Sequence, residues 1–133
     1  MPTLALAAVL AAQAASPPSI EGFWRSPGGN SIIAIAQCGS VAMCGTVAWA
    51  SDKAKKDAAK TTNQLMGTQL FTDLRQDSNG RWQGRLFIPD KNMRVTAKIQ
   101  LMSPEQLRVS GCAAGKSLCK AALWSRTSDP SGK

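Results

Sequence analysis

The chain has 133 residues, of which 44% are hydrophobic and 18% are charged, and its formal net charge is +8. These values are typical of one globular domain with a single core. The positive charge is compatible with anionic partners, and the alternative is that it only sets solubility. The sequence contains no histidine. It therefore lacks the usual acid–base group near neutral pH and the commonest metal ligand.

The N-terminal segment, MPTLALAAVLAAQAA, has the pattern of a secretory signal peptide. Its apolar run, Leu4–Ala12, is too short to span a bilayer, and Ala12–Ala14 is a small-x-small cleavage site. Because no Lys or Arg precedes this run, a cytosolic Ala-rich helix is the alternative. We expect a signal peptide over 1–15, a disordered lead-in over 16–19, and a periplasmic or secreted protein with no transmembrane segment in the mature chain.

Turn-forming Gly, Pro, Asn and Asp residues recur at near-regular spacing along the remaining chain, and apolar residues alternate between them. The clearest alternation is MRVTAKIQL, 93–101, which is typical of a half-buried antiparallel strand. We predict strands over 20–25, 31–37, 44–50, 66–75, 81–88, 93–101, 106–112 and 119–126. Short strands joined by hairpins indicate an all-β up-and-down barrel or a small sandwich over 20–127, followed by a flexible tail over 128–133.

The segment 51–65 departs from this pattern. Ser51 is a candidate N-cap and Asp52 follows it in the first turn, so the segment is predicted to form a short helix or helical loop. Its lysines form the only dense basic cluster of the sequence: Lys53, Lys55, Lys56 and Lys60. They are candidates for contact with an anionic surface, although most such clusters are simply solvated. The other basic residues are scattered along the chain.

The four cysteines allow three interpretations: a redox dithiol, a zinc site or two disulfides. Five residues separate Cys38 from Cys44, and six separate Cys112 from Cys119. Redox dithiols usually have two intervening residues, and paired zinc ligands two to four. Each pair instead flanks a predicted hairpin turn, where the two thiols can face each other. We therefore predict the disulfides Cys38–Cys44 and Cys112–Cys119, each stabilising its hairpin by about 2 kcal/mol.

A tryptophan follows the second cysteine of each pair by five positions, at Trp49 and Trp124. This odd offset places the tryptophan and the disulfide on opposite faces of the sheet, unless a bulge intervenes. Ordinary core packing is the commoner role for such residues. The candidate ligand-binding residues, which would line the barrel interior, are Trp24, Trp49, Trp82, Trp124 and Arg126.

Several segments in order resemble one bacterial family. They are GFW (22–24), CG…CGTVAW (38–49), LMGTQL (65–70), WQGRLFIPD (82–90), LRVSGC (107–112) and LCKAALWSR (118–126). This order is similar to that of the family known as domain of unknown function 2147. The resemblance covers nearly the entire mature chain. It implies a small exported envelope protein with a lipocalin-like β-barrel of about eight strands, and it implies no activity or catalytic residues.

Catalysis is not expected, because no histidine can act as base for a Ser, Thr or Lys nucleophile and no phosphate-binding loop is apparent. We expect no metal, no cofactor and no nucleic-acid partner. The favoured function is a non-catalytic binding module for a small apolar or anionic amphiphilic ligand. The alternative is an envelope accessory factor with a packed barrel, which binds a protein or a glycan through its surface.

Overall fold

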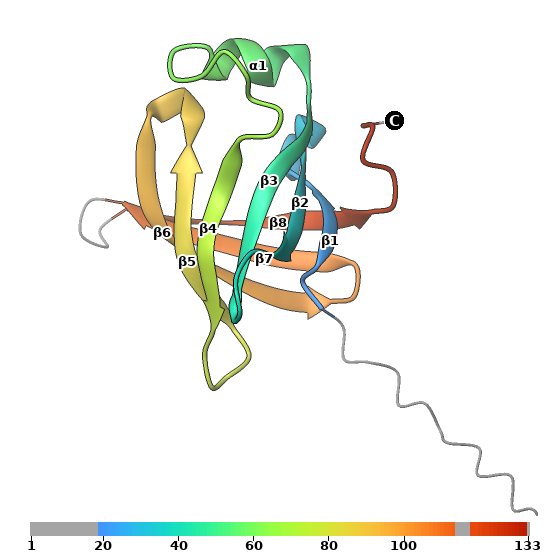
Figure 1. Cartoon of the computed structure of the whole chain (residues 1–133), viewed down its shortest axis with the longest axis vertical. Helices are drawn as coiled ribbons and strands as arrows, with labels where there is room; N and C mark the ends of the chain where they lie inside the picture. Colours follow the sequence, from blue (N-terminus) through green and yellow to red (C-terminus); the bar gives the residue numbers. More distant parts are fainter. Residues whose placement is uncertain (1–18, 114–117, 133) are drawn as a thin grey trace, which may run out of the picture.

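The computed structural model describes residues 19–113 and 118–132 of the chain. The predicted signal peptide lies outside these residues. The strands are β1 (Gly22–Arg25), β2 (Ser31–Gln37), β3 (Ala42–Ala50), β4 (Gln69–Gln76), β5 (Trp82–Ile88), β6 (Met93–Ser103), β7 (Gln106–Ala113) and β8 (Leu118–Thr127). They form one closed antiparallel barrel in chain order, and β1 pairs with β8 (Figure 1). The predicted eight-stranded barrel is confirmed, with strand ends a few residues from those expected.

The helix α1 (Asp52–Ala58) connects β3 to β4 and is shorter than the predicted segment 51–65. The Ser51 hydroxyl caps it by accepting a hydrogen bond from the Ala54 amide at 3.1 Å. After Ala58 the chain turns back, and the Thr61 hydroxyl donates to the Pro89 carbonyl at 2.7 Å. This bond ties the loop after α1 to η2 (Pro89–Lys91), a short 3-10 helix between β5 and β6. In the two described ranges, no helix has the length and apolarity needed to cross a bilayer.

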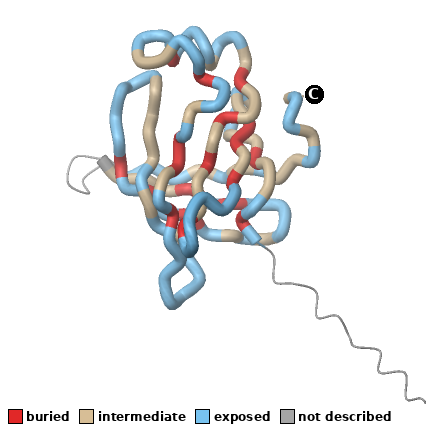
Figure 2. The backbone as a smooth tube through the Cα atoms, in the orientation of Figure 1, coloured by how far each residue is buried: buried red, intermediate tan, exposed pale blue. Residues whose placement is uncertain are grey.

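The barrel has two different ends. One end carries α1, η2 and a second 3-10 helix, η1 (Pro27–Gly29), and β1 begins toward the other end (Figure 1). The first is called the open end because a cavity opens there, and the second is called the closed end. Most buried residues lie on the strands, whereas the hairpins and α1 are mainly exposed (Figure 2). The largest inward side chains are fully buried: Trp24, Ile33, Ile35, Phe71, Leu74, Ile99 and Leu107. This core contributes most of the stability expected from apolar burial.

Arg126 seals the closed end. Its guanidinium lies 4.3 Å from the centre of the Trp24 ring, in cation–π geometry. The same group donates hydrogen bonds to the carbonyls of Ser19 at 2.6 Å, Glu21 at 2.8 Å and Pro104 at 2.6 Å. These bonds join β8, the segment before β1 and the β6–β7 turn around one cation.

Two disulfides hold hairpins on the outer surface. Cys38 and Cys44 are bonded with a Cα–Cα distance of 5.7 Å, and Cys112 and Cys119 with a distance of 4.0 Å. Both predicted pairings are therefore confirmed. Cys112 and Cys119 are also direct register partners in β7 and β8. Disulfides form and persist mainly in oxidising compartments, so these bonds indicate a location outside the reducing cytosol.

The seal at Arg126 requires a glycine at position 22, which has φ +129, and an added Cβ there would lie 2.6 Å from Arg126 Nη1. We expect Gly22→Ala to lower the free energy of unfolding by about 2–4 kcal/mol, through backbone strain and displacement of the guanidinium. Urea denaturation measures this change. The matched control is Gly67→Ala, because Gly67 has φ +84 but open space around the added Cβ; it should cost only about 1 kcal/mol. Equal losses in the two variants would contradict the proposed dependence on Arg126.

Candidate functional site

The open end contains an apolar cavity of about 550 Å³, a volume typical of small-molecule sites. It lies inside the barrel between β5, β6, β7 and β8. Its lining residues are Pro27, Leu86, Ile88, Lys91, Met93, Val95, Val109, Gly111, Lys120, Ala121, Ala122 and Trp124. Below, this space is called the open-end cavity.

Trp124 lines the inner part of the cavity, where it meets the packed core. Its ring makes an edge-to-face contact with Phe71, with the ring centres 6.2 Å apart and the planes at 69°. Such a contact is favourable beyond the area that it buries. Because Phe71 is fully buried, it supports Trp124 from the core side. The indole is therefore a fixed surface against which a ligand can pack.

The cavity exists because two inward positions near the open end carry small residues. Gly111 on β7 and Ala122 on β8 both line it, and their register partners, Lys120 and Val109, also point inward. At the closed end, the corresponding inward positions carry large side chains such as Trp24, which fill the space. The residue size along the barrel therefore leaves one half packed and the other half hollow.

Among the residues that the structure describes, Lys91 and Lys120 are the charged residues that line the open-end cavity. Both are exposed, Lys91 on η2 and Lys120 near the start of β8. With two cations and no carboxylate in the lining, the electrostatic potential at the mouth favours an anion. The cavity therefore combines an apolar interior with a positive entrance.

The structure does not bring together the five predicted ligand-binding residues. Only Trp124 lines the open-end cavity. Trp24 and Arg126 stack at the closed end, and Trp82 is half-buried against the core near that end. Trp49 lies on the outer face of β3 and does not belong to the side chains that pack together in the barrel core. A role for these residues in binding stays a prediction.

A bulge explains the position of Trp49. Ile32 pairs with Trp49 but Ile33 pairs with Val47, so Ala48 is an extra residue on β3. Because Ile33 and Val47 point into the core, the extra residue turns Trp49 to the outer face. The C-terminal residues lie against its indole there, since a Cβ added at Gly132 would overlap the ring. The flexibility predicted for 128–133 stays a prediction.

The predicted cluster of four lysines lies on and just after α1, where all four side chains are exposed. Lys53 forms an ion pair with Asp57 at 2.9 Å. This hydrogen bond, and then the charge of Asp57, raise the pKa of Lys53 above its ordinary value of 10.5. An anionic surface contact by this cluster stays a prediction.

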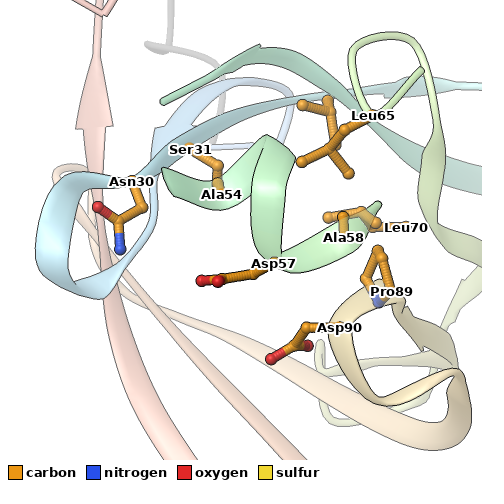
Figure 3. A pocket seen from close by; sticks show the side chains of 10 residues that line it. Asn30, Ser31, Ala54, Asp57, Ala58, Leu65, Leu70, Pro89 and Asp90 are labelled. Carbon is orange, nitrogen blue, oxygen red and sulfur yellow. The ribbon is translucent and has the colours of Figure 1, made fainter. Parts of the chain in front are cut away.

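A smaller cavity of about 190 Å³ lies beside α1, and Figure 3 shows Asp57 and Asp90 at its polar side. Ala58, Leu65 and Leu70 form part of its apolar wall. Asp57 is already paired with Lys53. Among the residues that the structure describes, no three Cys, His, Asp or Glu side chains are grouped as metal ligands would be. This cavity therefore offers less for recognition than the open-end cavity.

Sequence reasoning missed Lys120 and the small residues Gly111 and Ala122. The alternation of β8 contained the signal, because Lys120, Ala122, Trp124 and Arg126 share one face of the strand. Once Trp124 is placed inside the barrel, Lys120 must also point inward. Lys91 carried no such signal, because it lies in the turn between β5 and β6.

A closed eight-stranded antiparallel barrel with one sealed end and one hollow, apolar end is a lipocalin-like architecture. The chain belongs to the family DUF2147, described as "Uncharacterized protein conserved in bacteria", which matches residues 22–126. The resemblance inferred from the sequence is thereby confirmed.

Among solved structures, the chain is similar to protein HP1028 from the human pathogen Helicobacter pylori, which is described as belonging to the lipocalin family. The TM-score is 0.65, with 13% identity over 85% of this chain and 86% of that chain. At this identity the similarity establishes the fold alone. A comparison with curated proteins finds no match.

We expect the contact between Gly132 and Trp49 to weaken in acid. The Ser131 hydroxyl and then the Ser131 amide donate hydrogen bonds to Asp129, and these bonds, with the charge of Arg25, lower the pKa of Asp129 from its ordinary 3.8. A carboxyl whose pKa is lowered by folding stabilises the folded form above its unfolded pKa and loses that effect as the pH falls through its folded pKa.

Nuclear magnetic resonance can follow this change, because the indole ring shifts the Gly132 signals. These signals should move toward random-coil positions as the pH falls below the ordinary Asp129 value of 3.8. In Asp129→Asn they should not depend on pH in that range. An equal pH dependence in both proteins would show that another group controls the contact.

Proposed function

We propose that this protein is a non-catalytic, exported binding module that holds one small amphiphile with an apolar body and an anionic head. The observation that carries the proposal is the open-end cavity, whose lining over 19–113 and 118–132 is apolar and includes two lysines and no acidic residue. The apolar body would lie against Trp124, and the head would lie near Lys91 and Lys120. An eight-stranded barrel whose interior is not filled by side chains can hold one small ligand.

Two contributions to the binding free energy would provide the affinity: apolar burial and electrostatic attraction. Burying apolar ligand surface against the cavity wall contributes about 25 cal/mol per Å² before the costs of association are subtracted. The lysines add a smaller electrostatic term because both are exposed to solvent and salt. The apolar term should therefore determine affinity, and the lysines should determine the preference for an anionic head.

The chemistry of the cavity supports a role in binding rather than catalysis. Within the described part of the chain, Lys91 and Lys120 are the ionisable side chains of its lining, and no carboxylate or thiol accompanies them there. General acid–base or nucleophilic catalysis needs a second group within hydrogen-bond reach of the first. The two disulfides and the predicted signal peptide support export, to the periplasm or outside the cell.

Isothermal titration with dodecanoate and with dodecanol tests the cavity directly, because the two ligands share the apolar chain and differ in the head. Ala122→Phe places a large ring in the cavity and should weaken binding of both ligands by at least about 10-fold. The matched control is Ala36→Phe, on the exposed outer face of β2, which should leave both affinities unchanged.

The lysines are tested with the same pair of ligands. Lys120→Gln should weaken dodecanoate binding by about 5-fold, as expected for a partly exposed ion pair, and leave dodecanol binding unchanged. Lys55→Gln, on the exposed surface of α1, is the control of equal charge. If neither ligand binds, or if Ala122→Phe binds as well as the unmodified protein, the alternative of a surface-acting accessory factor is favoured.

A further inference from the structure

The outer surface of β4 to β7 gathers basic residues that are far apart in the sequence. Their side chains are all exposed and all occupy outward positions of the barrel. We call this surface the basic face, and it consists of Arg75, Arg85, Arg94, Lys98 and Arg108.

The register of the strands places these residues next to one another. Arg85 on β5 pairs with Thr96 on β6, so its diagonal neighbours on β6 are Arg94 and Lys98. Diagonal neighbours on one sheet face have Cα atoms about 7–8 Å apart, which is within reach of long side chains sharing one ligand.

The same diagonal continues on both sides. Lys98 pairs with Ser110 on β7, and Arg108 is therefore its diagonal neighbour. Arg75 on β4 pairs with Gln83, which makes it a diagonal neighbour of Arg85. The basic face is thus one continuous band across four adjacent strands.

Little negative charge balances this band. β5, β6, β7 and β8 contain no Asp or Glu. On β4, Asp73 pairs with Arg75 at 2.8 Å. In the described ranges the other ion pair is that on α1, so Arg85, Lys98 and Arg108 have no carboxylate partner. The guanidinium of Arg94 lies over the Phe87 ring at 4.7 Å, which holds its position but leaves its charge available.

The basic face meets the mouth of the open-end cavity at the start of β6. Met93 lines the cavity and is 37% exposed, and Arg94 is the next residue along the strand. An exposed apolar side chain beside a row of cations is the arrangement that suits an anionic lipid surface, where phosphates lie above apolar chains. Outward aromatic platforms that would stack nucleic-acid bases are missing, because the one outward ring of β5 and β6 is covered by Arg94.

We propose that the basic face docks this protein on an anionic phospholipid membrane surface. The contact is peripheral: the cations of the outer wall bind headgroup phosphates, and the rim of the cavity at Met93 lies at the edge of this contact. This geometry would bring the entrance of the cavity to the place where an amphiphile is stored. The docking rests on the surface charges and does not require the cavity to be occupied.

Sedimentation with vesicles tests the proposal. The protein should bind vesicles in which phosphatidylglycerol replaces part of the phosphatidylcholine, should not bind pure phosphatidylcholine, and should dissociate as salt is added. The face variant carries three neutralising substitutions: Arg85→Gln, Lys98→Gln and Arg108→Gln. At about 1 kcal/mol for each cation near the surface, the vesicle partition coefficient should fall on the order of 100-fold.

The control variant removes the same number of charges from the other basic region: Lys55→Gln, Lys56→Gln and Lys60→Gln. It should keep nearly all of the vesicle binding. If the two variants lose binding equally, net charge alone drives the interaction, and the assignment of docking to the basic face is wrong. Heparin is an acidic polysaccharide without lipid. If it binds more tightly than the vesicles, and if the face variant loses heparin binding as it loses vesicle binding, the proposal of a lipid partner is wrong.

The cavity variant Ala122→Phe separates this inference from the proposed ligand. It should bind anionic vesicles as well as the unmodified protein, because its substitution lies inside the barrel. A loss of vesicle binding in this variant would overturn a docking mechanism based on surface charge. A failure of dodecanoate to bind, with vesicle binding intact, would instead count against the cavity function alone.

Discussion

The stacking of Arg126 on Trp24 is the interaction on which the arrangement of the barrel depends. β1 is only four residues long, so its pairing with β8 provides few backbone hydrogen bonds for closure. Arg126 adds three hydrogen bonds to carbonyls from two other segments and covers the buried indole of Trp24. One cation thereby reinforces the β1–β8 closure of the sheet and seals one end. The seal directs any entry of a ligand to the opposite end.

The inward face of β8 shows how one strand defines both ends. It begins with Lys120 at the open mouth, continues through Ala122 and Trp124 along the cavity, and finishes with Arg126 at the seal. The two cations have opposite roles because their surroundings differ. Arg126 has its donors bonded to carbonyls, whereas Lys120 lies exposed in a lining whose described residues include no Asp or Glu. The same strand therefore carries a structural cation and a candidate recognition cation.

Much of this fold was predictable because the strands alternate and the turns use Gly, Pro, Asn and Asp. The disulfide pairing followed from hairpin spacing and was confirmed. The position of Trp49 was not predictable, since a single extra residue at Ala48 reverses the face on which it lies. The basic residues looked scattered for a related reason. The register of three strands makes neighbours of Arg85, Lys98 and Arg108. This register cannot be read from the sequence alone.

Strand alternation has a further consequence for how such proteins diverge. On β6, Val95 lines the cavity while Arg94 and Thr96 on either side of it lie on the outer face. A substitution at an inward position changes the shape of the interior, and one at an outward position changes the surface charge, with little effect of either on the other. The lining of the interior and the charge of the outer surface can therefore evolve independently. The same barrel frame is compatible with different interiors behind one outer surface, and with different outer surfaces around one interior.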